Sequence, residues 1–206
     1  MAGARPPAAF SKSPLEIHVV RSGDHFGRIY SDTHPDPLGY SKSTSRFSDP
    51  RRRIAASRFG VVYLGESLTV CFLEAVLRDQ RDGVIGGLPL DQDEIAKRLY
   101  ADIEVVDHLR LVDLRDECAI RMGVPTDVHR ASKQTLARVW SVAFHEHPDG
   151  PDGIIYPSRL NGQTNLAIYG RGVSKLRVHR LRRLIAAPGL ANVLDDLSVE
   201  LVTQDP

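Results

Sequence analysis

A single carboxylate interrupts the most apolar stretch of the sequence. Glu74 lies in SLTVCFLEAVL, residues 67–77, where almost every other side chain is apolar. If this stretch is a helix capped by Ser67, its apolar side chains lie on all sides and the helix is buried. Burying an unpaired carboxylate costs several kcal/mol, so Glu74 needs a partner, a raised pKa or a cleft to face. A structural salt bridge to an arginine and a place in a functional site are both open interpretations.

Other residue types that often carry chemistry form weaker patterns. His145 and His147 project to different faces of a helix, so we expect solvated histidines there and no metal site. The sequence contains no G-x-S-x-G, G-x-G-x-x-G or P-loop motif. Arg46 stands beside an aromatic residue in SRF and is either a surface arginine or a phosphate ligand. Ser158 follows an expected strand and a proline, where a turn serine is also common.

Composition and charge are those of an ordinary globular chain. The 206 residues suffice for one domain with a full core, and 42% are hydrophobic and 26% charged. The formal net charge of +1 gives no argument for binding to nucleic acid or to a membrane. No apolar run approaches the ~20 residues of a membrane span, and no signal peptide is expected. Cys71 and Cys118 are expected to be free, buried thiols, and we predict a cytoplasmic protein.

The elements expected around Glu74 mix strands and helices without a regular alternation. Strands are expected within residues 15–21, 61–64, 101–114 and 172–181, and a hairpin-like pair within residues 152–170. Helices are expected within residues 67–77, 91–99 and 126–147, and a short helix with a last strand within residues 188–202. Residues 1–14 are expected to be a flexible arm and residues 22–58 a long loop. We therefore predict one α+β domain over residues 15–206.

Taken together, several stretches resemble the RES domain family, whose members are typically toxins of bacterial toxin–antitoxin pairs. The matching stretches are HVVR at residues 18–21, SRFS at 45–48, VVYLGESLTVCFLEAV at 61–76 and DGIIYPSRLNGQTNLAIY at 152–169. The resemblance implies an ADP-ribosyltransferase-like fold, with a split, mainly antiparallel β core, flanking helices and a cleft that holds NAD+. It also implies a helix-turn-helix antitoxin that blocks this cleft.

The resemblance implies roles for individual residues. Arg21 would hold a phosphate of NAD+, Tyr63 would pack against the nicotinamide or its ribose, and Glu74 would act on the ribose. Ser158 matches the serine of the family and would orient Glu74 or contact the substrate. The further cleft residues implied by the resemblance are Arg46, His25 and Asn165. NAD+ is then the substrate, with no metal and no other cofactor.

Three functions are compatible with this sequence. The first is a toxin that cleaves the nicotinamide–ribose bond of NAD+ with water or phosphate as acceptor, that is, an NAD+ glycohydrolase or phosphorylase. The second is an ADP-ribosyltransferase acting on a macromolecule, and the third is a catalytically silent binding module. Because Arg21, Tyr63, Glu74 and Ser158 are all present, we favour a catalytic function. The expected partners are NAD+ and an antitoxin, with residues 22–58 as a candidate contact surface, and neither a membrane nor nucleic acid is expected.

Overall fold

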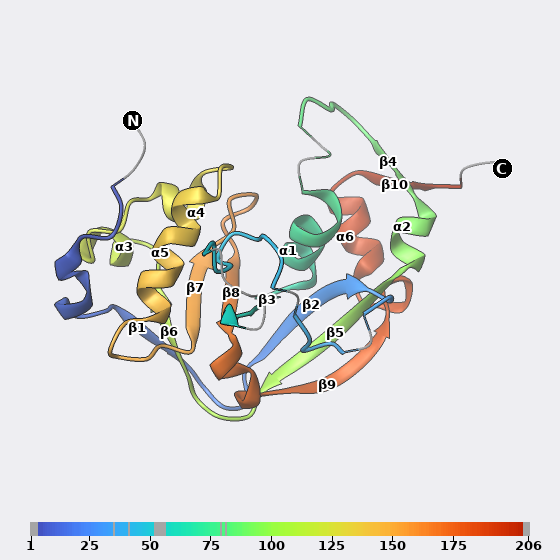
Figure 1. Cartoon of the computed structure of the whole chain (residues 1–206). Coiled ribbons are helices and arrows are strands. Elements are labelled where there is room, and N and C mark those ends of the chain that lie inside the picture. Colours follow the sequence, from blue (N-terminus) through green and yellow to red (C-terminus); the bar gives the residue numbers. More distant parts are fainter. Residues whose placement is uncertain are drawn as a thin grey trace.

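A curled, mainly antiparallel sheet of eight strands forms the core of the protein (Figure 1). The computed structural model describes residues 4–34, 36–40, 42–51, 57–78, 80 and 82–203. The strands follow the spatial order β1, β6, β7, β8, β3, β2, β5, β9. Their bounds are β1 Ile17–Val20, β2 His25–Ser31, β3 Val61–Gly65, β5 Arg98–Val105, β6 Leu109–Asp113, β7 Gly153–Pro157, β8 Thr164–Tyr169 and β9 Leu176–Arg183. Of the neighbouring pairs, β6 and β7 run parallel and the others antiparallel.

Helices flank this sheet, and a small second sheet adjoins it. The α-helices are α1 Leu68–Phe72, α2 Gln92–Ala96, α3 Cys118–Arg121, α4 Asp127–Arg130, α5 Thr135–His145 and α6 Leu190–Asp196. A π-helical turn, Leu73–Leu77, continues α1, and 3-10 turns occupy Ala8–Lys12, Gly170–Lys175 and Leu184–Ala186. The second sheet pairs β4 Leu88–Asp91 with β10 Val199–Val202 in parallel. No helix in the described ranges is long and apolar enough to cross a membrane.

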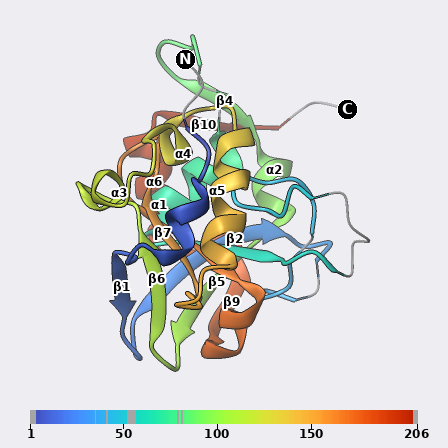
Figure 2. The same ribbon diagram turned by 60° about the vertical axis from the view of Figure 1, so that its left-hand side comes forward.

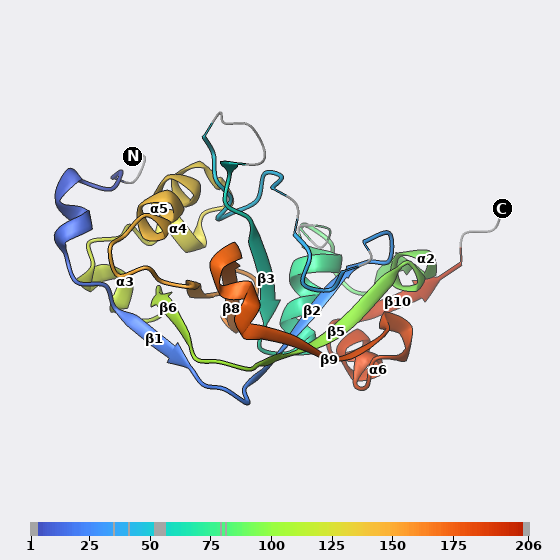
Figure 3. The same ribbon diagram turned by 60° about the horizontal axis from the view of Figure 1, so that its bottom comes forward.

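The large sheet is split between β3 and β2. These strands pair only at Gly65 and Gly27, whereas β3 pairs with β8, and β2 with β5, over their whole lengths. Both positions favour glycine, because a Cβ on Gly65 would lie 2.6 Å from a Val70 methyl and 2.8 Å from the Cys71 sulfur, and one on Gly27 would lie 2.9 Å from the Tyr100 ring and 3.0 Å from the same sulfur. From this junction β3 and β2 diverge (Figure 3), which gives the sheet two halves joined at one paired position, while a further apolar cluster packs across both halves.

Each half of the sheet is covered by its own helices. One apolar cluster joins Trp140 and Phe144 of α5 to strands β6, β7 and β8. A second cluster joins α1 and α6 to β2, with Val70 and Phe72 among its fully buried members. Since α1 begins directly after β3, the chain crosses from one half of the sheet to the other at the split.

The α+β class with a mainly antiparallel core is confirmed. Ser67 caps α1 as expected, since its Oγ accepts a hydrogen bond from the Val70 N–H at 3.1 Å, and both cysteines are free, with Cys118 only partly buried. The expected helix at residues 126–147 is instead two helices, α4 and α5, because Ala131 has an extended backbone. The reading of residues 22–58 as one loop is wrong, since β2 lies within them and gains its hydrogen-bond partners from the distant β5.

The N-terminal segment is packed against α5 from Ala4 onward (Figure 2). The Phe10 side chain is 4% exposed, and its ring lies edge-on to that of Trp140 with 4.9 Å between centroids. The Trp140 indole N–H donates to the Ala4 carbonyl at 2.9 Å. Phe10 therefore extends the core, and residues 4–14 are anchored to α5 through it and are not the free arm that their Pro/Ala composition indicated.

Candidate active site

A pocket of about 370 Å³ opens where the sheet is split. Gly27 to Tyr30 of β2 form one wall and Tyr63 to Gly65 of β3 form another. The π-helical turn contributes Glu74, and the remaining walls come from loop segments around residues 44–46, 132–134 and 159–160. Its size lies in the range of small-molecule sites.

Glu74 faces this pocket and is held by two neutral hydrogen-bond donors. Its Oε1 accepts from the Ser158 hydroxyl at 2.7 Å and from the Asn165 amide at 3.0 Å. Within the described ranges, no arginine, lysine or histidine forms an ion pair with Glu74, and its Oε2 has no hydrogen-bond donor. The structure therefore does not support the structural salt bridge considered from the sequence, including one to Arg21 or Arg46.

The π-helical turn sets the direction of the Glu74 side chain. Its wider ring is closed by the Arg78 N–H donating to the Leu73 carbonyl at 2.7 Å, five residues back. Such turns are rare and often occur at functional sites. The Arg78 side chain folds back, and its Nε donates to the Glu74 carbonyl oxygen at 2.8 Å. The Glu74 carboxylate thus projects from a turn whose backbone is fixed by two hydrogen bonds.

The two donors come from the hairpin of β7 and β8. Ser158 directly follows β7 and Asn165 lies on β8, and both are almost fully buried. The Ser158 N–H donates to the Gln163 carbonyl at 2.7 Å, which closes the hairpin. The Ser67 hydroxyl donates to the Gln163 side-chain oxygen at 2.7 Å, so the start of α1 is bound to the same hairpin.

Tyr63 holds the SRFS segment in place. Its hydroxyl lies 2.9 Å from the Ser45 hydroxyl and accepts the Phe47 N–H at 2.9 Å. Burial raises the pKa of Tyr63, so the phenol stays protonated. Between these two anchors, Arg46 donates to the Ala131 carbonyl at 2.8 Å and lines the pocket. Tyr63 and Arg46 thus both line the pocket, and Tyr63 positions the segment that carries Arg46.

Arg28 and Tyr30 line the pocket but were missed from the sequence. The Arg28 guanidinium donates to the carbonyls of Pro37 and Gly39 and lies 5.5 Å from the Tyr30 ring centroid. The Tyr30 hydroxyl is buried and has no hydrogen-bond partner among the described residues. The available signal for a strand was the alternation of larger side chains at Phe26, Arg28 and Tyr30. From the sequence we instead expect these residues to be part of a long loop.

Three of the residues proposed from the sequence are not among the lining residues: Arg21, His25 and Ser158, of which Ser158 acts on the pocket through its hydrogen bond to Glu74. Arg21 is exposed after β1, and its backbone N–H donates to the Asp24 carboxylate at 2.9 Å. His25 is exposed at the start of β2 and lies 2.8 Å from the Asp102 carboxylate. Neither is among the lining residues, whereas Arg46, Tyr63, Glu74 and Asn165 are.

The charges of the lining favour an anionic ligand that also carries a positive centre. Arginines line the pocket on several sides, and Glu74 is the carboxylate among the lining residues. The arginines are Arg28, Arg46, Arg78 and Arg159. Guanidinium groups bind phosphate oxygens well, while an unneutralised carboxylate stabilises positive charge that develops near it.

Two further ionisable side chains in the lining are neutral. Burial, together with the nearby Glu74 carboxylate, raises the pKa of the Cys71 thiol to about 12. Burial also raises the pKa of Tyr156, and Tyr63 and Glu74 add to the effect. Because only the thiolate is a strong nucleophile, Cys71 is unsuited to attack a substrate. With no nucleophilic thiolate in the lining, the chemistry that the site offers is stabilisation of positive charge by the Glu74 carboxylate.

Comparison with known proteins agrees with this architecture. A family model described as the RES domain matches residues 19–199. Probable toxin y4kH of Sinorhizobium fredii is 39% identical over 127 residues, which are 61% of this chain and 100% of that protein. The crystal structure of the M. tuberculosis MbcT–MbcA toxin–antitoxin complex contains a chain that superposes with a TM-score of 0.59 at 16% identity, over 86% of this chain and 92% of that chain. The last comparison shows a shared fold.

Proposed function

Since the chain belongs to the RES domain family, we propose that it is the toxin of a toxin–antitoxin pair and that it cleaves the nicotinamide–ribose bond of NAD+. The observation that carries the proposal is the Glu74 carboxylate, which faces the pocket without a neutralising cation among the described residues. The relative named as a probable toxin supports the biological role.

NAD+ carries a negative and a positive group, and both match the charges of the pocket lining. Its pyrophosphate is anionic and would be bound by Arg28 and Arg46, which stand on different walls. We assign this contact to Arg28 in place of Arg21, because Arg21 lies outside the pocket. The cationic nicotinamide ribose would then lie toward Glu74, and the unpaired Tyr30 hydroxyl would gain a polar partner from the substrate.

Cleavage of this bond develops positive charge on the ribose. As the bond between C1′ and the pyridinium nitrogen breaks, its electron pair leaves with nicotinamide, which departs neutral and needs no general acid. The oxocarbenium character left on the ribose is stabilised by the Glu74 carboxylate, as in glycoside hydrolysis. Water or phosphate then adds at C1′ and gives ADP-ribose with release of a proton, or ADP-ribose-1-phosphate.

Ser158 and Asn165 would keep the carboxylate in the productive orientation. Both donate to the same oxygen, Oε1, so the other oxygen is left for the ribose hydroxyls. Because both donors are neutral, they orient Glu74 without cancelling its charge. Tyr63, on the strand that pairs with the strand of Asn165, would act by fixing the segment that carries Arg46.

An enzyme that consumes NAD+ would harm its own cell, so we also propose an antitoxin that covers the pocket. A helix-turn-helix protein is the expected partner type. The pocket lining includes Thr44 to Arg46, which belong to the region proposed as a partner surface, so one bound protein could contact that region and block the substrate.

Product analysis tests the reaction directly. Purified protein is incubated with NAD+, with and without inorganic phosphate, and the products are identified by mass spectrometry. We expect nicotinamide together with ADP-ribose or, in phosphate, ADP-ribose-1-phosphate. Nicotinamide release only in the presence of cell extract, with ADP-ribose attached to a macromolecule, would instead identify a transferase. No nicotinamide release under any of these conditions would refute the enzymatic proposal.

A further inference from the structure

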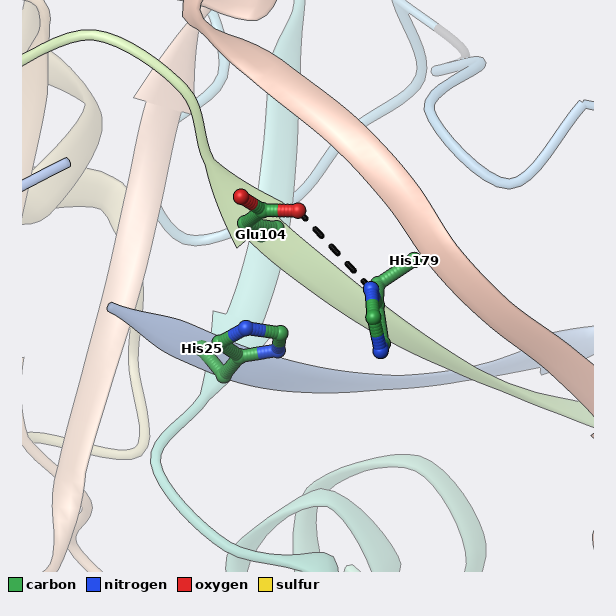
Figure 4. Close-up of side chains that lie close together, drawn as sticks. All are labelled: His25, Glu104 and His179. Carbon is green, nitrogen blue, oxygen red and sulfur yellow. Dashed lines mark ion pairs between the residues drawn. The ribbon is translucent and has the colours of Figure 1, made fainter. Parts of the chain in front are cut away.

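A second cluster of ionisable side chains lies outside the pocket, on three neighbouring strands. It consists of His25 of β2, Glu104 of β5 and His179 of β9 (Figure 4). One ligand atom from each residue lies within 4.8 Å of the other two. None of the three lines the pocket, so the cluster is separate from the proposed NAD+ site.

Strand register and a β-bulge bring these side chains together. His25 stands directly opposite Glu104 in the antiparallel pair of β2 and β5. The register of β5 against β9 shifts between Asp102 and Ile103, where β9 carries His179 as an additional residue. Bulges of this kind redirect a side chain. Here the His179 Nδ1 atom comes to 3.8 Å from the Glu104 Oε2 atom.

His25 is already oriented as a metal-ligating histidine usually is. The Nδ1 atom of His25 lies 2.8 Å from an Asp102 carboxylate oxygen, so its Nε2 atom remains for another partner. A carboxylate behind a ligating imidazole fixes the ring and its tautomer, a frequent arrangement at metal sites. The rings of His25 and His179 stand edge-on at 4.9 Å between centroids, so both imidazoles border the same small volume beside Glu104.

We propose that His25, Glu104 and His179 bind a divalent transition-metal ion of the zinc class. Two imidazoles and one carboxylate supply three ligands, and water completes a tetrahedral site. Bonds of about 2.1 Å require ligand atoms roughly 3.4 Å apart, so ligand atoms that lie up to 4.8 Å apart must close by up to about 1.4 Å. They are free to do so, because the His25 and His179 side chains are 42% and 40% exposed.

The local charge is compatible with a dication. Glu104 and Asp102 each contribute a negative charge, and Arg177 opposes them with one hydrogen bond of 2.7 Å to the Glu104 Oε2 atom. Arg177 is 65% exposed and can turn into solvent, which leaves Oε2, the oxygen 3.8 Å from His179 Nδ1, for the metal. Imidazole and carboxylate together favour zinc-like ions over magnesium or calcium, which prefer oxygen ligands throughout.

A metal here would fasten the edge of the sheet. β9 is the terminal strand of the sheet, and its ligand His179 would be joined through the ion to β5 and β2. The three ligands come together only in the folded chain, so the ion binds the folded state and not the unfolded one. Its contribution to the free energy of unfolding grows with the logarithm of the ratio of the free metal concentration to the dissociation constant. The site would therefore act on stability, at a distance from the proposed chemistry.

Titration with Zn²⁺ tests the proposal. The full chain, without a histidine tag and stripped with a chelator, is titrated with Zn²⁺ and followed by calorimetry. We expect one equivalent to bind, a loss of this binding in His25→Ala and in His179→Ala, and a loss of about 10-fold in affinity in Asp102→Asn. His34→Ala, an exposed histidine in the turn after β2, is the matched control and should bind as the wild type does.

A second measurement does not depend on how the variants fold. In NMR spectra of the wild-type protein, Zn²⁺ should shift the imidazole ring signals of His25 and His179 and leave those of the other histidines in place. No Zn²⁺ binding by the wild type, binding unchanged in His179→Ala, or shifts confined to other histidines would each overturn the proposal. In that case the cluster would be an ion-pair network and no metal site.

Discussion

Replacing Glu74 by glutamine removes one charge from the proposed active site and leaves its shape. The glutamine side-chain oxygen can still accept the hydrogen bonds that Ser158 and Asn165 now donate to Oε1. Since no cation is paired with Glu74 among the described residues, the substitution leaves no partner charge unpaired. We therefore expect the free energy of unfolding to change by no more than about 1 kcal/mol.

The effect on the reaction should be far larger. A unit charge about 4 Å from a carboxylate, at an effective dielectric constant of about 20, is stabilised by about 4 kcal/mol. At about 1.4 kcal/mol per factor of ten, the full effect corresponds to roughly 1,000-fold in rate. The transition state carries only part of a unit charge, so we expect kcat to fall between about 100- and 1,000-fold.

The assay is the initial rate of nicotinamide release at saturating NAD+, with the melting temperature measured in parallel. Glu66→Gln is the matched control, because Glu66 lies just before α1, is exposed, and accepts the Thr164 N–H at 2.8 Å without lining the pocket. Its kcat should stay within about twofold of the wild type. If folded Glu74→Gln protein releases nicotinamide as fast as the wild type, Glu74 does not stabilise the transition state.

The remaining predictions concern the residues around this site and the core. Ser158→Ala removes one donor to Glu74, so kcat should fall about 10-fold with little change in KM, measured by the same assay. Gly65→Ala would put a Cβ 2.8 Å from the Cys71 sulfur and should lower the unfolding free energy by about 1–3 kcal/mol, measured by urea titration; unchanged stability would contradict the close packing at the split. Burial, with neighbouring arginines, lowers the pKa of His129 to about 4. As the pH falls, His129 is therefore protonated in the unfolded chain before it is protonated in the folded chain. Stability present above about pH 6.5 should be lost as pH falls toward 4, by up to about 3 kcal/mol, and His129→Gln should flatten that pH dependence in urea titrations.

The part of the site that was predicted from the sequence rests on local patterns. An isolated carboxylate in an apolar helix marked Glu74, and the Ser67 cap marked where that helix begins. The hairpin after residue 152 was readable because turn residues separate two β-rich runs. Side-chain periodicity and capping depend on residues a few positions apart, so one sequence is enough to detect them.

The partners of Glu74 could not be read in this way. Ser158 and Asn165 lie 84 and 91 positions along the chain, and an arginine was an equally reasonable partner until the strands were placed. Arg28 was missed for the same reason, since β2 becomes a strand through its pairing with β5, about 75 residues later. Strand pairing is a long-range contact, which local propensity does not determine.

The sequence by itself determined the family resemblance, the apolar helix that carries Glu74 and the types of residue available for chemistry. The tertiary structure alone decided which of them meet. It placed Arg28 at the pocket in place of Arg21, and it moved His25 to a separate cluster with Glu104 and His179. The physical reason is the split of the sheet at two glycines, because the cavity is formed by the relative position of the two halves of the sheet and not by any one segment.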